Sequence, residues 1–288
     1  MKLHVINTGL FKLDGGAMFG VVPKSIWSKT NVPDENNMCS WAMRCLLIED
    51  GNRLILIDNG IGDKQDAKFL GHYYLHGNDT LQKSLKAIGF DRTDITDMFL
   101  THLHFDHCGG SIQFNNNHSG FELAFSNAQY WCNEQHWEWA TKPNPREKAS
   151  FLKENILPIQ ESGHLKWISK ESEWTEGSAL GKEIGISFMN GHTNAMMLPH
   201  IRYKGKTVVF MADLLPSTAH IPLPFVMAYD TRPLLTMTEK EIFLRKAAEE
   251  EYILFFEHDP VTQCCTVQNT EKGVKLKDKF TLAECFGA

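Results

Sequence analysis

The residues best suited to chemistry lie together in the segment Thr101-His102-Leu103-His104-Phe105-Asp106-His107. Within six positions it carries three imidazoles and one carboxylate, the groups that zinc and similar divalent cations prefer as ligands. His102 and His104 alternate along the chain, so in an extended segment both side chains point to the same side. Asp106 and His107 follow where a helix is expected to begin, and its turn directs them toward a neighbouring ion. The spacing therefore favours two adjacent metal ions over one.

The segment follows Asp97–Thr101, which we interpret as a short buried strand whose end presents the ligands. Paired strands with helices between them predict a layered α/β fold. The other expected strands are Leu3–Thr8, Trp41–Glu49, Arg53–Asp58, Phe121–Phe125, Leu165–Ser169, Ile184–Asn190, Leu198–Tyr203, Thr207–Ala212 and Tyr252–Glu257. Helices are expected from Asp79 up to Gly89, over Ala128–Ala140, within Pro143–Pro158 and over Thr238–Glu251.

Three further polar residues follow predicted strands: His192, Asp213 and His258. Loops at strand ends are held by a rigid scaffold and often carry functional groups. Taken alone, each of these residues would more often be a structural histidine, a turn residue or a cap. Their positions after strands make them candidate ligands that complete the cluster around His102.

These segments together resemble the metallo-β-lactamase superfamily. His102-x-His104-x-Asp106-His107 matches the family's HxHxDH motif, and Asp58 ends a strand as in the family's early D-x-G element. Gly191-His192-Thr193 is similar to the segment of the third histidine. Asp213 stands where the family has a metal-bridging aspartate, and His258 stands where its last histidine is expected. The five elements occur in the family's order and cover most of the chain.

The resemblance implies a four-layer αββα sandwich that holds two divalent metal ions per chain, with zinc as the expected metal. One ion would be bound by His102, His104 and His192, and the other by Asp106, His107 and His258. Asp213 and a hydroxide would bridge the two ions. Asp106 would also act as the catalytic proton shuttle. Asp58 is expected to orient a histidine through its outer ring nitrogen.

Two such cations, roughly 3.5–4 Å apart, can lower the pKa of a bridging water to near neutrality and polarise a substrate carbonyl. This chemistry needs no serine or cysteine nucleophile, and the sequence contains no G-x-S-x-G segment. The expected reaction is therefore hydrolysis of a small ester or lactone.

The segments Leu13–Trp27, Asp213–His220 and Ala228-Tyr229-Asp230 resemble a narrower group, the YtnP-type quorum-quenching N-acyl homoserine lactonases. This resemblance implies a lactone substrate. The apolar residues between Met18 and Trp27 either line an acyl-chain site or pack an N-terminal loop on the core. Some lactonases of the superfamily have a lactone-binding tyrosine where this chain has Pro216, and Tyr229 or His220 are the candidates to replace it.

Two alternative functions remain open at the level of sequence. Phosphotriester or aryl-ester hydrolysis of the methyl-parathion-hydrolase type would use the same ligands. A metal-binding interaction protein on the same scaffold is the non-enzymatic alternative, although such a protein has no chemical reason to keep a complete dinuclear ligand set.

Composition limits the range of partners. The formal charge is −6, from 29 Lys+Arg and 35 Asp+Glu, and no block of like charge stands out. The sequence thus indicates neither a nucleic-acid nor an anionic membrane partner. Met1–Leu10 lacks the pattern of a secretory signal, so we expect a cytoplasmic protein. The seven cysteines form no CxxC pair and are expected to be reduced. No linker interrupts the chain, so residues 1–288 are predicted to form a single domain, and a homodimer is left open.

Overall fold

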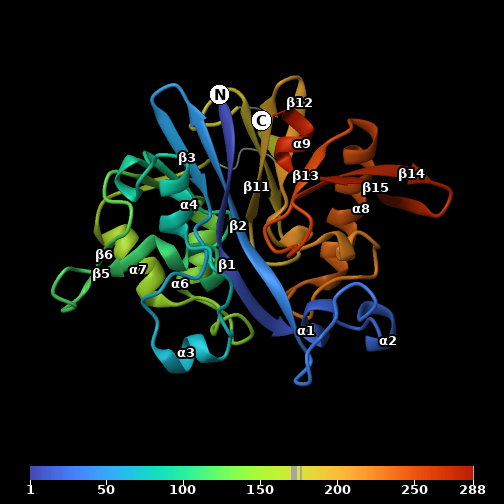
Figure 1. Ribbon diagram of the computed structural model, residues 1–288, viewed down its shortest axis with the longest axis horizontal. Helices are drawn as coiled ribbons and strands as arrows, with labels where there is room; N and C mark the ends of the chain where they lie inside the picture. Colours follow the sequence, from blue (N-terminus) through green and yellow to red (C-terminus); the bar gives the residue numbers. More distant parts are fainter. Residues whose placement is uncertain (170–173, 176, 288) are drawn as a thin grey trace. The chain divides into compact units, whose positions relative to one another are not determined.

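The computed structural model describes residues 1–169, 174–175 and 177–287, which cluster into two compact units (Figure 1). Unit 1 consists of Met1–Gly9 and Met43–Glu171, and unit 2 consists of Leu10–Ala42 and Ser172–Ala288. Strands β1 (Lys2–Asp14) and β2 (Met38–Asp50) contribute residues to both. Each unit combines a β-sheet with helices, which confirms the predicted α/β class.

Unit 1 is built on a six-stranded sheet in the order β1-β2-β3-β4-β7-β8. Strands β3, β4, β7 and β8 run parallel to one another, so their carboxyl ends meet at the same edge. Asp58 follows β3 and the histidine segment follows β4 at this edge. These strands are β3 (Arg53–Ile57), β4 (Asp97–Phe99), β7 (Gln129–Cys132) and β8 (Leu165–Trp167).

The remaining elements of unit 1 are short. A separate hairpin pairs β5 (Ile112–Phe114) with β6 (Phe121–Leu123). The helices are α3 (Ala67–Gly71), α4 (Leu81–Ala87), α5 (Phe105–Cys108), α6 (Glu134–Thr141) and α7 (Lys153–Glu161). The N-cap of helix α4 is Thr80, one residue after the expected start at Asp79. The hydroxyl of Thr80 accepts a hydrogen bond from the backbone N–H of Lys83.

Two helices predicted for this unit were placed wrongly. Ala128–Ala140 contains strand β7 and only then helix α6, whose cap is Asn133. Gln129–Cys132 extends the parallel sheet between β4 and β8, and this pairing overrides any local helical tendency. The second helix was expected between Pro143 and Pro158, but α7 covers Lys153–Glu161 and includes Pro158.

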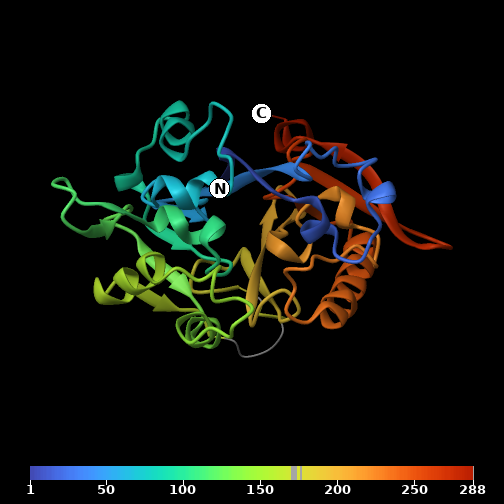
Figure 2. The same ribbon diagram turned by 90° about the horizontal axis from the view of Figure 1, so that it is seen from below.

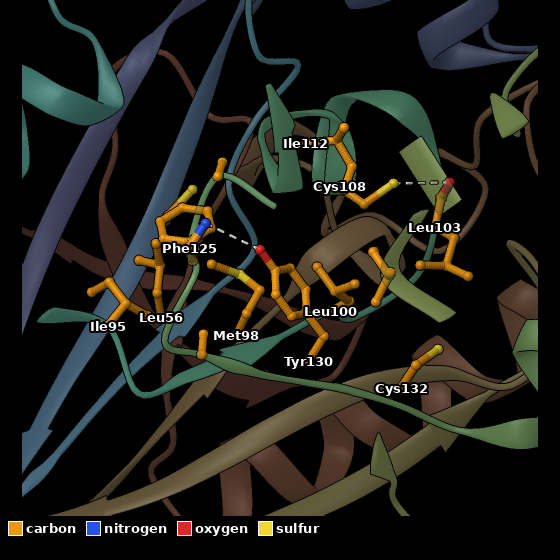
Figure 3. Close-up of a cluster of buried hydrophobic side chains, with 14 of the residues drawn as sticks. Leu56, Ile95, Met98, Leu100, Leu103, Cys108, Ile112, Phe125, Tyr130 and Cys132 are labelled. Carbon is orange, nitrogen blue, oxygen red and sulfur yellow. Dashed lines mark hydrogen bonds between the residues drawn. The ribbon is translucent and has the colours of Figure 1, made fainter. Parts of the chain in front are cut away.

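The hydrophobic core of unit 1 includes Leu103, which belongs to the histidine segment, and Cys108, which follows it (Figure 3). The hydroxyl of the fully buried Tyr130 makes two hydrogen bonds. It accepts one from the backbone N–H of Phe125 at 3.2 Å and donates one to the carbonyl of Ser111 at 3.0 Å. Cys108 donates its thiol to the carbonyl of Leu103 at 3.3 Å, and burial raises the pKa of this thiol to about 12. Cys108 is therefore a packing residue.

Unit 2 contains a seven-stranded sheet in the order β15-β14-β13-β12-β11-β10-β9. Strands β10, β12 and β13 all point in the same direction, because β11 is antiparallel to β10 and β12, while β12 and β13 are parallel. Their carboxyl ends, which lead to His192, Asp213 and His258, therefore share one edge. The strands are β9 (Trp174–Thr175), β10 (Ile184–Met189), β11 (Met196–Tyr203), β12 (Lys206–Phe210), β13 (Ile253–Phe255), β14 (Cys264–Thr270) and β15 (Gly273–Phe280).

Helix α8 (Pro233–Glu249) contacts β14, and Figure 2 shows it in orange beside the red β14–β15 hairpin. It begins five residues before the predicted start at Thr238, with Pro233 in its first turn. Proline is favoured there because its missing N–H is not needed by the helix. The other helices of unit 2 are α1 (Gly15–Phe19), α2 (Lys24–Trp27) and α9 (Leu282–Phe286).

Among the described residues, no helix combines the length and hydrophobicity needed to cross a bilayer.

Candidate metal centre

His102 and His104 lie in the extended segment after β4, with both side chains on the same side as their alternation predicted. Nε2 of His102 lies 3.1 Å from Nδ1 of His104, and the two rings are 6% exposed or less. This separation suits an N–H···N hydrogen bond and also two ligands of one cation. The structure therefore brings this pair together as the sequence indicated, with different ring nitrogens facing each other.

His107 is oriented by Asp58, a contact that the resemblance also implied. Nδ1 of His107 lies 3.0 Å from the Asp58 carboxylate, and both side chains are fully buried. The same carboxylate accepts from the backbone N–H of Thr101 at 2.8 Å and from its hydroxyl at 2.7 Å. Asp58 adopts the left-handed region (φ 55°), a strained conformation often found at functional sites. With its proton held on Nδ1, the ring has its lone pair on Nε2, 4.0 Å from a carboxylate oxygen of Asp106.

His136 supports the histidine segment from helix α6. It is fully buried, and its Nε2 accepts a 2.9 Å hydrogen bond from the backbone N–H of Leu103. It thereby fixes the peptide between His102 and His104. The contact joins a loop to a helix 33 residues further along the chain, so no local pattern could have indicated it.

The segment Pro143–Pro158 contributes buried side chains to unit 1. Glu147 and Phe151 are buried, and the ring of Phe151 lies 4.8 Å from that of His104. The carboxylate of Glu147 lies 3.4 Å from Nε2 of His104. These residues are part of the interior of unit 1, so the segment supports His104 from within.

In unit 2 the carboxylate of Asp213 faces two imidazoles, one with each oxygen. Oδ2 lies 3.1 Å from Nε2 of His192, and Oδ1 lies 3.2 Å from Nε2 of His258. A zinc ion bonded to a nitrogen and an oxygen at tetrahedral angles holds those two atoms about 3.3 Å apart. The observed spacings thus fit a carboxylate that shares one cation with each imidazole.

The other nitrogen of each of these rings is anchored inside unit 2. Nδ1 of His192 lies 2.9 Å from the Asp230 carboxylate, and Nδ1 of His258 lies 2.7 Å from the carbonyl of Ala42. Both partners accept hydrogen bonds, so each ring carries its proton on Nδ1 and turns Nε2 toward Asp213. Asp230 belongs to a segment noted for its resemblance to lactonases, but its contact with His192 was not predicted.

The electrostatics at His192 favour a positive charge. Burial lowers the pKa of this imidazole, but the carboxylates of Asp213 and Asp230 outweigh burial and raise it to about 10. A proton or a metal cation can supply the charge that the two carboxylates stabilise. The donor set, imidazole nitrogen and carboxylate oxygen, is the one that zinc-like cations bind.

The loop that carries His192 is fixed by the start of helix α8. Glu239 accepts from the backbone N–H groups of Asn190 at 2.7 Å and Gly191 at 2.9 Å. The backbone N–H of Arg232 donates to the carbonyl of Gly191 at 2.8 Å. A Cβ at position 191 would lie 2.3 Å from the hydroxyl oxygen of Thr236, so glycine is required for this close approach.

His200, His220 and part of the N-terminal apolar segment are buried. His200 is buried, and its Nε2 lies 2.8 Å from the hydroxyl oxygen of Ser187. His220 is held by Ser217 and by the carbonyl of Met18, whereas Tyr229 is 39% exposed. Met18, Phe19, Val22 and Trp27 are buried, which favours the alternative in which this segment packs on the core.

Comparisons with known proteins agree with this picture. The structure matches that of a probable metal-dependent hydrolase from Staphylococcus aureus with a TM-score of 0.84, covering 97% of this chain and 96% of that one at 27% identity. It also matches AidC, a dizinc quorum-quenching lactonase, with a TM-score of 0.78 at 20% identity, covering 98% and 97% of the two chains. A quorum-quenching N-acyl homoserine lactone lactonase matches with a TM-score of 0.66 at 21% identity, covering 90% and 92%.

No curated protein sequence matches the chain. Residues 44–258, which include every predicted ligand, match the family model of the metallo-beta-lactamase superfamily. Together with the fold and the two groups of histidines and carboxylates, this match assigns the family. The chain belongs to the metallo-β-lactamase superfamily and has the α/β fold and the metal-dependent hydrolase chemistry of that family.

Proposed function

We propose that the protein is a dinuclear metal-dependent hydrolase that opens the lactone ring of N-acyl homoserine lactones. In this proposal the two units act as one catalytic domain. His102, His104 and His192 would hold one zinc ion, and Asp106, His107 and His258 would hold a second. Asp213 would contribute to both sites.

The observation that carries the proposal is the arrangement of Asp213, whose two oxygens face the Nε2 atoms of two different imidazoles. A carboxylate that served a single cation or a structural hydrogen bond would not need both oxygens directed in this way. The anchored Nδ1 atoms of His107, His192 and His258 support the same reading, since each leaves its lone pair on Nε2.

Two divalent cations supply, when bound, a water-derived nucleophile near neutral pH and positive charge that stabilises the transition state of ester hydrolysis. The protein's own residues hold the geometry. Asp106, 8% exposed, is the group that we propose to accept and return the proton of the reaction. Its neighbour Tyr73 has a pKa raised to about 12 by burial and by the charge of Asp106, so the phenol keeps its proton throughout.

Three aromatic rings beside Asp106 support a substrate with an apolar chain. Tyr73 lies 4.6 Å and Phe69 lies 5.4 Å from the ring of Phe105, measured between centroids. Phe69 and Tyr73 are only partly buried, so apolar ring surface borders the proposed proton shuttle. The fold is shared with AidC, described with the product N-hexnoyl-L-homoserine bound, and with AiiA, described with N-decanoyl-L-homoserine bound.

The proposal is tested on protein purified without chelator. We expect about two zinc ions per chain by elemental analysis, and a higher kcat/KM for N-acyl homoserine lactones than for paraoxon-type triesters or aryl esters. Exhaustive chelation should abolish turnover, and reloading with zinc should restore it.

Each other outcome points to a specific alternative. A higher kcat/KM for triesters would favour the phosphotriester hydrolase. A fully metallated protein that hydrolyses no ester would favour the metal-binding interaction protein. Undiminished turnover after chelation would overturn the dinuclear mechanism itself.

A further inference from the structure

Glu147 is a buried carboxylate of unit 1 outside the predicted ligand set. Its side chain is 3% exposed, and Oε1 lies 3.4 Å from Nε2 of His104. Burying a carboxylate costs free energy unless polar partners compensate for the lost water. Its position behind a predicted ligand indicates a role toward that ligand.

The orientation of this carboxylate is fixed by two donors. Oε2 accepts from the indole N–H of Trp139 at 2.7 Å and from the side-chain amide of Asn144 at 2.6 Å. Asn144 is held in turn, because its own side-chain oxygen accepts from the backbone N–H groups of Arg146 and Glu147. A glutamate held this way presents Oε1 to His104 without losing further rotamer freedom when it makes that contact.

The same segment contacts the His104 region in two more places. The ring of Phe151 packs 4.8 Å from the His104 ring, and the carbonyl of Ser150 accepts from the backbone N–H of Phe105 at 3.0 Å. Residues 147–151 therefore contact the His104 region through a carboxylate, an aromatic ring and a backbone carbonyl.

Among the predicted ligands, His104 differs from His107 and His192 in which ring nitrogen faces its supporting carboxylate. Asp58 and Asp230 face Nδ1 of His107 and His192, whereas Glu147 faces Nε2 of His104. The atom of His104 that lies close to His102 is correspondingly Nδ1. A carboxylate at one ring nitrogen keeps the proton there and leaves the lone pair on the other.

We propose that Glu147 is a positioning residue that keeps the proton of His104 on Nε2, so that Nδ1 is the atom offered to the metal ion. This inference rests on the proposed metal centre but not on the lactone substrate. It predicts that the affinity for one of two metal ions depends on a residue that never touches that ion.

The test compares Glu147→Gln with the wild-type protein and with Glu138→Gln, which changes an exposed glutamate on helix α6. The glutamine amide would place a donor against the protonated Nε2 and remove the preference for this tautomer. We expect the affinity of one cobalt or zinc ion to fall by about 10- to 100-fold in chelator competition. The visible spectrum of the cobalt-loaded protein should also change, while Glu138→Gln should match the wild type.

A purely structural role is separated by unfolding in the presence of chelator, where Glu147→Gln should unfold like the wild type. Trp139→Phe is a second variant, which keeps a ring but loses the N–H that orients Glu147. It should weaken metal binding by a smaller factor. If both variants bind two cobalt ions with the wild-type affinity and spectrum, the inference is overturned. A wild-type protein that binds two ions but opens no lactone would instead overturn only the substrate assignment.

Discussion

At the scale of single residues, the chemistry of the proposed centre depends on which nitrogen of each imidazole carries the proton. Acceptors decide this: Asp58 for His107, Asp230 for His192 and the Ala42 carbonyl for His258. Histidine alone does not determine its own tautomer, so these partners are as important for metal binding as the ligands themselves.

Asp213 gives the sharpest prediction at this scale. Asp213→Ala removes the oxygens that face His192 and His258, so at least one metal ion should be lost. We expect kcat/KM to fall by at least about 1,000-fold, equivalent to about 4 kcal/mol of transition-state stabilisation. Elemental analysis and lactone hydrolysis measure the two effects. Asp278→Ala, an exposed aspartate on β15, is the control and should retain both metals and turnover.

At the scale of elements, strand direction places the polar residues. In unit 1 the parallel strands β3 and β4 end side by side, which brings Asp58 to Thr101. In unit 2 the parallel strands β12 and β13 end beside each other, which brings Asp213 to His258. In both units the loops after these strands carry the proposed site residues, while the strands provide rigidity.

The contact between the His192 loop and helix α8 can be tested at Gly191. Gly191→Ala would place a methyl group 2.3–2.5 Å from three atoms of Thr236, so the loop or the helix must shift. We expect a loss of about 1–3 kcal/mol in the free energy of unfolding, measured with urea, and weaker metal binding. Gly71→Ala is the matched control, because a Cβ there meets no atom within 4 Å. If Gly191→Ala unfolded and bound metal like Gly71→Ala, the close approach would not matter for the site.

At the scale of the whole molecule, buried neutral histidines link stability to pH. Burial lowers the pKa of His200 to about 3 and that of His220 to about 4, from an ordinary value of 6.5. Between these values and 6.5 the unfolded chain binds more protons than the folded one. The stabilisation is therefore complete above pH 6.5 and is lost as the pH falls toward the folded-state pKa.

His200→Gln tests this linkage, since glutamine does not titrate and can still bond to Ser187. Between pH 7 and pH 4, in the presence of chelator, we expect the wild-type protein to lose about 3 kcal/mol more unfolding free energy than the variant. Urea unfolding at several pH values provides the measurement. His192 does not obscure the comparison, because both proteins retain it and its own pH-dependent contribution cancels in the difference. Equal slopes for both proteins would contradict a neutral, buried His200.

Local sequence determined the parts of this protein whose chemistry and geometry lie within a few residues. The alternation of His102 and His104 was enough to predict that they share a side, because extended backbone has a period of two. The sequence also placed His192, Asp213 and His258 directly after predicted strands. The end of an apolar run marks the end of a buried strand.

Only the tertiary structure decided which groups stand behind these residues. His136, Glu147 and Asp230 act through contacts with residues far away in the chain, and a buried polar partner has no sequence period that could reveal it. The strand Gln129–Cys132 was missed in the same way, since it exists because β4 and β8 flank it. The chain contains many other histidines and carboxylates with the same chemistry. Which of them lies beside a given histidine is decided by the packing of distant segments, and local sequence patterns do not report that packing.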